Sequence, residues 1–362
     1  MAFGRNKYCQ NAAACHILPP MKIEKTYWWE ELPENELLQV RLCDLKLDFK
    51  KAPHITLALA QLKKEIEKKG LSFKPHFWIS DEWFSPDSMP GIAIPFYLFH
   101  PKLIKLEKNF IGKVEGLRPD HLMKLLRHET GHAFESAYRL RKNKLRSELF
   151  GESSTPYPNE YEAKPFSKNY VRHLEENYAQ AHPDEDFAET FAVWLTPGSD
   201  WKNIYFGTGA YEKLMGMQKL MKDIQGKRAL VRNRKRMDAI ENDKRTIREY
   251  LMSKKKRILK KSLLSSKYRL NKLFTPIKSH PRSLEAHQAL IKHKKMIIGS
   301  IAKNTNQYQY NVERMFKNLV RECRANKLHL KFKSKDFEVR LKKELTKNAL
   351  LYFEEGYHRI LM

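Results

Sequence analysis

Cysteine, long apolar runs and, over the last third of the chain, acidic side chains are scarce in this sequence of 362 residues. The four cysteines, Cys9, Cys15, Cys43 and Cys323, are too few and too scattered for a disulfide scaffold. Cys9 and Cys15 do not have the spacing of a zinc ribbon either. Because free thiols suit a reducing compartment, we expect a cytoplasmic protein.

The absence of long apolar runs bears on membranes and secretion. No stretch approaches the roughly 20 consecutive apolar residues of a membrane-spanning helix. Residues 1–20 also lack the apolar core of a secretory signal. We therefore expect no membrane span. Separately, a chain of this length is long enough for two domains of ordinary size.

Acidic residues are unevenly distributed. Residues 1–225 hold 32 Lys and Arg against 30 Asp and Glu, whereas residues 226–362 hold 37 against 12. This asymmetry predicts an N-terminal tail over 1–25, a folded domain over 26–225 and a basic helical module over 226–362. Basic runs at 232–236 and 254–261 suit nucleic acid or another polyanion without reading its sequence. A simple solvated helical appendage is the alternative.

Hydrophobic spacing predicts a mixed α+β domain in which a small sheet covers a helix. Alternation favours strands at 37–49, 73–80 and 91–100. Apolar residues at helical spacing, with proline at the start of several segments, predict helices at 53–69, 119–141, 170–178 and 183–196.

The helix at 119–141 carries the pentapeptide His128-Glu129-Thr130-Gly131-His132. Two histidines four residues apart share one helix face, with Cβ atoms about 5–6 Å apart, and can bind one metal ion. Glu129 points to a neighbouring face, where it can reach a water molecule. These residue types at this spacing predict half of a zinc hydrolase site.

A third ligand is expected on the helix at 183–196. Glu185 and Glu189 are four residues apart and share a face, while Phe187, Phe191 and Trp194 can anchor the other side in a core. One carboxylate can bind the metal, and the other can accept the free N–H of a ligating histidine. The spacing alone leaves open which of the two does which.

An HExxH helix followed by an acid-x-x-x-acid helix resembles the gluzincin metallopeptidases. The string E-x-F-A-E at 185–189 is also similar to the third-ligand helices of lethal factor and the Mlc titration factor peptidases. These resemblances imply Glu185 as the zinc ligand and Glu189 as the partner of a histidine. They also imply Tyr178, seven residues before Glu185, as the group that polarises the scissile carbonyl.

A broader resemblance covers roughly residues 35–225. The strings LLRHETGHAFESAYRL, SSTPYPNEY and YAQAHPDEDFAETFAVWL resemble the bacterial family called putative zinc-binding metallopeptidases. This resemblance implies a zincin-like fold and Zn²⁺ as cofactor, without naming a substrate. It does not extend to the basic C-terminal part.

The sequence therefore predicts a zinc peptidase in which Glu129 moves the proton of the attacking water and the basic module recruits an anionic substrate or partner. The alternative is a binding protein for nucleic acid or an anionic scaffold that keeps a peptidase-like fold without turnover. The intact Glu129 favours the enzyme. Deformylases also use an HExxH helix, but their third ligand is a cysteine, and no cysteine here lies in a suitable motif.

Overall fold

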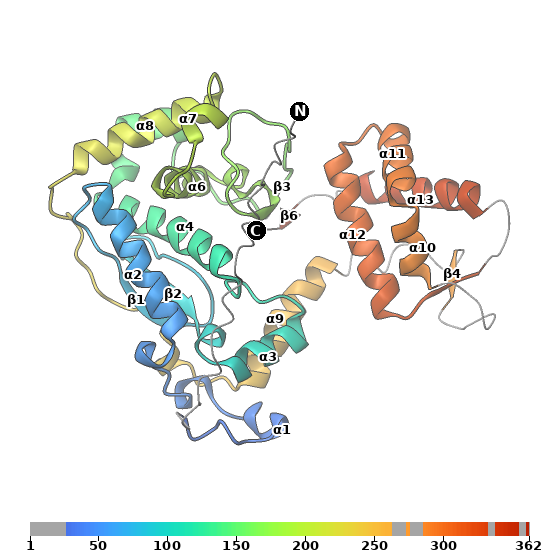
Figure 1. Cartoon of the computed structure of the whole chain (residues 1–362), viewed down its shortest axis with the longest axis horizontal. Coiled ribbons are helices and arrows are strands. Elements are labelled where there is room, and N and C mark those ends of the chain that lie inside the picture. Colours follow the sequence, from blue (N-terminus) through green and yellow to red (C-terminus); the bar gives the residue numbers. More distant parts are fainter. Residues whose placement is uncertain (1–26, 263–272, 276–284, 332–336, 355–359, 362) are drawn as a thin grey trace, which may run out of the picture.

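The computed structural model describes residues 27–262, 273–275, 285–331, 337–354 and 360–361 (Figure 1). It is mostly helical, with small two-stranded sheets. The expected tail at 1–25, with Cys9 and Cys15, lies outside the described residues. The helices and strands in chain order are α1 (Glu34–Leu37), α2 (Pro53–Lys68), β1 (His76–Ser80), β2 (Gly91–Pro95), α3 (Pro101–Ile111), α4 (Pro119–Ala137), α5 (Lys144–Phe150), β3 (Glu160–Tyr161), α6 (Pro183–Leu195), α7 (Trp201–Ile204), α8 (Gly209–Ile224), α9 (Ile247–Ser262), β4 (Phe274–Thr275), α10 (Ala286–Lys292), α11 (Lys294–Thr305), α12 (Gln309–Ala325), β5 (His329–Leu330), α13 (Phe337–Glu354) and β6 (Ile360–Leu361).

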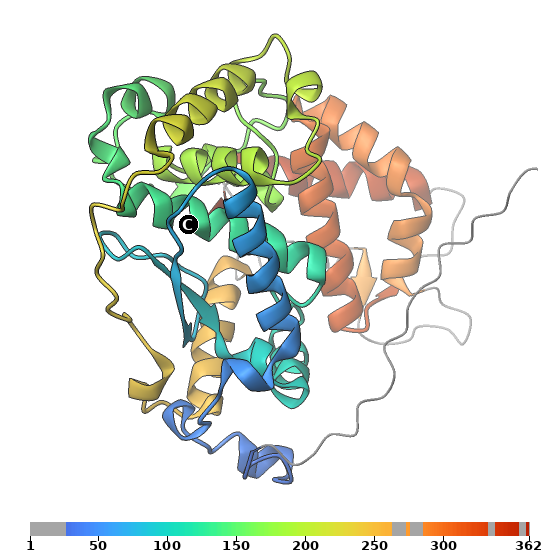
Figure 2. The same cartoon turned by 60° about the vertical axis from the view of Figure 1, so that its left-hand side comes forward.

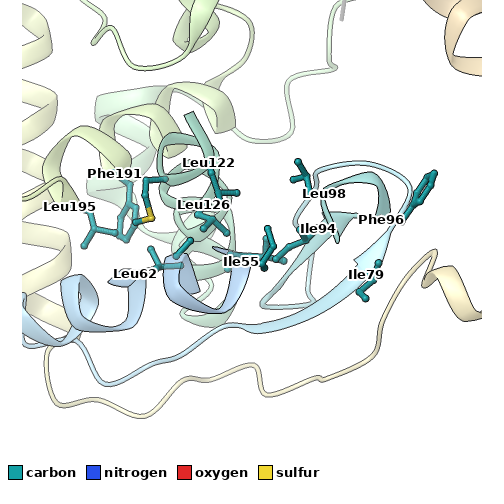
Figure 3. Close-up of a cluster of buried hydrophobic side chains, with 14 of the residues drawn as sticks. Ile55, Leu62, Ile79, Ile94, Phe96, Leu98, Leu122, Leu126, Phe191 and Leu195 are labelled. Atoms are coloured by element: carbon teal, nitrogen blue, oxygen red, sulfur yellow. The ribbon is translucent and has the colours of Figure 1, made fainter. Parts of the chain in front are cut away.

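Residues 27–262 form the first part of the molecule. Helix α4 lies at its centre, between α6 on one side and α2 with the β1–β2 sheet on the other (Figures 1 and 2). β1 and β2 are parallel, in register from His76 opposite Gly91 to Ser80 opposite Pro95. Figure 3 shows apolar side chains from α2, β2, α4 and α6 in one continuous cluster, among them Leu62, Ile94 and Leu126. Burial of this cluster fixes the position of α4.

The start of α4 follows the expectation, and its end does not. Pro119 occupies the first turn and Asp120 adds a negative charge there, as helix starts favour. The helix was expected to continue to about residue 141 but stops at Ala137. Arg139 takes a left-handed conformation, with φ of 54°, which breaks the helix before a short 3₁₀ turn at Leu140–Lys142.

Two further predictions are confirmed at nearly the expected bounds. The helix expected over 53–69 is α2, and Gly70 follows it with φ of 72°, as a helix stop requires. The helix expected over 183–196 is α6, with Pro183 in its first turn. Both helices have proline in the first turn and apolar residues at helical spacing, which are signals visible in the sequence.

The strand expected over 37–49 is wrong. The segment instead contains the end of α1 and 3₁₀ turns at Leu42–Asp44 and Phe49–Lys51. Its backbone bonds to residues 243–248, through Leu42 N–H to Arg245 O and Ile247 N–H to Val40 O. The backbone of this segment is therefore hydrogen-bonded to a distant segment, but the two do not form a regular pair of β-strands.

The other two strands are shorter than expected, and one expected helix is wrong. β2 ends at Pro95, and residues Phe96–Phe99 form a 3₁₀ turn. In place of a helix at 170–178 there is a 3₁₀ segment, η5, at Glu175–Gln180. Glu176 and Asn177 have left-handed φ of 63° and 57°, which an α-helix does not allow.

The described residues form two main hydrophobic clusters. The first includes Ile240 and Tyr250 and so continues past residue 226. The second runs from Leu273 to Phe353 and is built from Leu273, Phe274 of β4 and the helices α10 to α13. The expected basic module of 226–362 is thus divided between the two clusters, and α9 packs on α3 of the first part (Figure 1). Within the described residues, no helix combines the length and apolar character needed to cross a membrane.

Candidate metal centre

His128, His132 and Glu185 lie together between α4 and α6, and all three are buried. The Nε2 atoms of the two histidines are 3.2 Å apart. Oε2 of Glu185 lies 3.1 Å from Nε2 of His128 and 3.3 Å from Nε2 of His132. Donor atoms around a tetrahedral zinc with bonds of about 2.0–2.1 Å stand about 3.3 Å apart. The three atoms therefore have the spacing of three corners of a zinc coordination sphere.

Glu185 and the two histidines stabilise each other's charged forms. Burial lowers the pKa of His128, but hydrogen bonds with Glu185 and Glu189 outweigh it and hold this pKa well above its ordinary value. Burial likewise raises the pKa of Glu185, but His132 and His128 outweigh it and hold this pKa well below its ordinary value. The carboxylate is thus ionised. The positive charge that it attracts can be supplied by a metal ion in place of imidazole protons.

Glu189 lies one turn further along α6 and contacts the other nitrogen of His128. Its Oε1 is 2.8 Å from Nδ1 of His128, and its Oε2 accepts the backbone N–H of Leu174 at 2.8 Å. With Nδ1 bonded to a carboxylate, Nε2 is the nitrogen that faces Glu185 and His132. This is the arrangement in which an outer carboxylate fixes the orientation of a metal-binding imidazole.

Glu129 and Tyr178 line the same cleft, which has a volume of about 490 Å³. Glu129 is buried, and burial raises its pKa despite the two neighbouring histidines. The ring of Tyr178 lies 5.6 Å from that of His128. Burial, with Glu185 and Glu129 nearby, raises the pKa of Tyr178, so its hydroxyl stays protonated as a hydrogen-bond donor. Other parts of the wall are formed by Trp83, Phe84, Leu125, Arg141 and Glu175.

Tyr157 is a cleft residue to which sequence reasoning assigned no role. Its hydroxyl donates to Oε1 of Glu185 at 3.1 Å, and its ring stacks on His182 with centroids 3.7 Å apart. Its only signal in the sequence is its place between Pro156 and Pro158 in the loop before α6. That pattern marks a constrained loop, not a partner 28 residues away.

The two helices that carry the three residues approach very closely. A Cβ on Gly131 would lie 2.8 Å from Cα of Ala188, so only glycine permits this distance. Arg146, fully buried, donates to Glu135 of α4 at 2.7 Å and to Asp184 of α6 at 2.5 Å. These contacts set the separation and rotation of α4 relative to α6.

Two further buried histidines, His182 and His173, lie close to the site. His182 caps α6 by accepting the N–H of Asp184 at 3.1 Å, and His173 is buried with Nε2 3.0 Å from the carbonyl oxygen of Lys124. Cys43 and Cys323 are free thiols. Cys323 lies in the second hydrophobic cluster, where it packs as a small apolar residue.

Comparison with known proteins agrees with this geometry. Residues 119–206 match the model of a family described as "putative zinc-binding metallo-peptidase". The matched segment runs from the start of α4 through α7 and contains both helices of the centre. Zinc is the cofactor that this family description names, and the cluster of His128, His132 and Glu185 can hold a metal ion. No curated protein and no solved structure matches the chain.

Proposed function

We propose that this protein is a zinc-dependent peptidase with a zincin-like catalytic domain. The observation that carries the proposal is the mutual spacing of 3.1–3.3 Å between two imidazole nitrogens and one carboxylate oxygen. Two histidines and a glutamate are a common ligand set of catalytic zinc and leave a coordination position open. The match of residues 119–206 to a zinc-binding peptidase family supports the same reading.

In this proposal His128, His132 and Glu185 hold the metal, and Glu189 keeps His128 oriented. Bound zinc supplies a Lewis acid that lowers the pKa of water and polarises a carbonyl group. Glu129 accepts the proton of the attacking water and gives it to the nitrogen of the leaving amine. The Tyr178 hydroxyl donates a hydrogen bond to the carbonyl oxygen as negative charge develops there.

The contacts of Tyr157 and Tyr178 indicate different roles for their hydroxyl groups. The Tyr157 hydroxyl is engaged with Glu185. Among the described residues the Tyr178 hydroxyl has no such partner, so it can donate to a substrate. Tyr178 is therefore assigned to the substrate, and Tyr157 to the metal ligand.

The test compares wild type with Glu129→Gln on a library of quenched fluorescent peptides, after both are loaded with zinc. Glu129→Gln should keep the metal and lose about 10²–10⁴-fold in turnover, since general-base catalysis contributes that much. Glu148→Gln is the matched control, because Glu148 is an exposed glutamate on α5. Equal turnover in wild type and Glu129→Gln would remove Glu129 from this role.

We propose further that the basic module expected over 226–362 recruits an anionic substrate or partner. The proposed binding surface is a groove formed by residues 228–234 together with residues 72–76 and Pro90. This groove, of about 410 Å³, is lined by Lys74, Arg228, Arg232 and Arg234, and no Asp or Glu is among its described lining residues. Binding of a labelled polyanion such as heparin should weaken steeply as salt rises from about 50 to 200 mM. Binding that is independent of salt would argue against this groove.

A further inference from the structure

The segment that carries Tyr178 has a strained backbone. Glu176 and Asn177, directly before Tyr178, both adopt left-handed conformations, with φ of 63° and 57°. Two successive residues other than glycine in this region are uncommon and persist only when surrounding contacts hold them. The position of the Tyr178 hydroxyl in the cleft therefore depends on what holds residues 176 and 177.

Two of the contacts to these residues come from helix α12, near the end of the chain. Arg314 on α12 places Nη2 3.6 Å from Oε1 of Glu176. Tyr310, one turn earlier on the same helix face, interacts with the Asn177 side chain, which lowers the pKa of Tyr310 against the larger, opposite effect of burial. One face of α12 thus contacts both left-handed residues.

The surrounding packing is continuous with these two contacts. The rings of Tyr310 and Tyr178 pack on a small cluster that contains Tyr161, and the Tyr161 hydroxyl donates to the carbonyl oxygen of Glu176 at 3.2 Å. Strand β6, at the end of the chain, pairs with β3, which contains Tyr161 (Figure 1). The segment before Tyr178 is therefore contacted directly by α12, and by β3, which in turn pairs with β6.

We propose that Tyr310 and Arg314 are positioning residues, which hold the Glu176–Asn177 turn so that the Tyr178 hydroxyl faces the reacting carbonyl. This inference rests on the proposed function, in which Tyr178 stabilises the developing charge. The metal residues lie on α4 and α6 and are held by contacts of their own. Loss of the α12 contacts should therefore impair turnover and spare zinc binding.

The experiment uses the full-length protein with Arg314→Ala and Tyr310→Phe, with Arg324→Ala as an exposed control on the same helix. kcat and KM are measured on the best-cleaved peptide of the quenched library, and zinc affinity by competition with a chelator. A group at an oxyanion contributes about 10²–10³-fold to kcat, so partial loss of its alignment should lower kcat about 10-fold. KM and zinc affinity should stay within about twofold. Arg314→Lys should keep most of kcat, because the ion pair with Glu176 at 3.6 Å needs a positive charge and not the bidentate geometry of a guanidinium group.

A double-mutant cycle separates positioning from general destabilisation. In a Tyr178→Phe background, Arg314→Ala should have little further effect on kcat, because both changes remove the same interaction. Full additivity of the two losses would contradict the proposal. An equal fall in zinc affinity would do the same.

Hydrogen exchange gives a readout that does not need turnover. Amides of residues 175–181 should exchange faster in Arg314→Ala than in wild type, and Arg324→Ala should match wild type. If wild type cleaves no peptide of the library, the proposed function fails by itself, and exchange still decides the role of α12. Unchanged exchange at 175–181 in Arg314→Ala would overturn the inference.

Discussion

At the scale of single residues, Glu185 makes two distinct interactions through its two oxygens. Oε2 faces the two histidines, whereas Oε1 accepts the Tyr157 hydroxyl. A carboxylate fixed by one oxygen presents the other in a defined direction. Tyr157 therefore pre-orients the proposed metal ligand, as groups bonded to ligating residues do at many metal sites.

This role predicts the effect of Tyr157→Phe. Removal of one hydroxyl should leave the fold intact and weaken zinc about 10-fold, at the low end of the range for groups that orient metal ligands. Chelator competition measures the affinity, with Tyr308→Phe, an exposed tyrosine, as the control. Unchanged zinc affinity in Tyr157→Phe would show that Glu185 needs no such support.

His173 gives a prediction about stability and pH. Burial lowers the pKa of His173 to about 4 from an ordinary value of 6.5, and Glu189 opposes the shift only in part. Because the folded-state pKa is depressed, the contribution to stability is complete above about pH 6.5 and is lost as pH falls towards 4. The difference of about 2.5 pH units corresponds to about 3 kcal/mol as an upper figure.

The variant His173→Gln tests this by urea unfolding at several pH values. Glutamine has no proton to gain in this range and can still donate to the Lys124 carbonyl. The free energy of unfolding should therefore fall less for the variant than for wild type between pH 6.5 and 4.5. Parallel curves would contradict the assignment.

At the scale of elements, the site depends on how closely α4 and α6 approach. Gly131 lies at the crossing, where an added Cβ would be 3.2 Å from the carbonyl oxygen of Ala188 and 3.2 Å from Cβ of Phe191. Backbone atoms cannot move aside as a flexible side chain can. The distance between the histidines and Glu185 is thus set at this glycine.

Gly131→Ala should therefore cost about 1–3 kcal/mol of stability by overpacking, and it should also weaken zinc binding by separating the two helices. Gly299→Ala on α11 is the matched control, since nothing lies within 4 Å of an added Cβ there. That control should be neutral or stabilising by up to about 1 kcal/mol. Thermal unfolding and chelator competition measure both effects, and equal behaviour of the two variants would contradict this account of the crossing.

The same scale shows which parts of the fold can be predicted from sequence. Helices α2 and α6 and the start of α4 were predictable because proline, charge and apolar spacing act within a few turns. The structure of segment 37–49 was not predictable, since its backbone forms hydrogen bonds with residues 243–248, far away in the sequence. The two left-handed residues before Tyr178 also depend on α12, which no local pattern indicates.

The candidate site was likewise predictable only in part. Residue types and spacing indicated the two histidines and one of two glutamates, because the chemistry of a metal site restricts both. The contact of Tyr157 with Glu185 requires the loop before α6 to fold back over the cleft. Its sequence signal is too weak to predict that.

At the scale of the whole molecule, two concave surfaces differ in charge. The wall of the cleft at the metal centre holds more acidic residues than cations, with Lys113 and Arg141 beside Asp87, Glu115, Glu175 and Glu176. The described lining of the groove at residues 228–234 includes four cations and no Asp or Glu. Substrate hydrolysis and polyanion binding are therefore expected at separate places.

This separation predicts the behaviour of a triple variant in which Arg228, Arg232 and Arg234 are changed to Gln. Polyanion affinity should fall at least about 10-fold and its salt dependence should decrease, because fewer counterions are released. Cleavage of short uncharged peptides should remain within about twofold of wild type. Loss of cleavage in parallel with binding would show that the groove and the cleft act as one site.

The central claim is that His128, His132 and Glu185 bind a single zinc ion. Its most direct test is elemental analysis of the purified full-length protein after equilibration with zinc and removal of the excess, for wild type, His132→Ala, Glu185→Ala and Glu148→Ala. The account predicts about one zinc per chain for wild type and Glu148→Ala, and a large loss for the other two. Wild type without zinc, or zinc retained in full by Glu185→Ala, would contradict it.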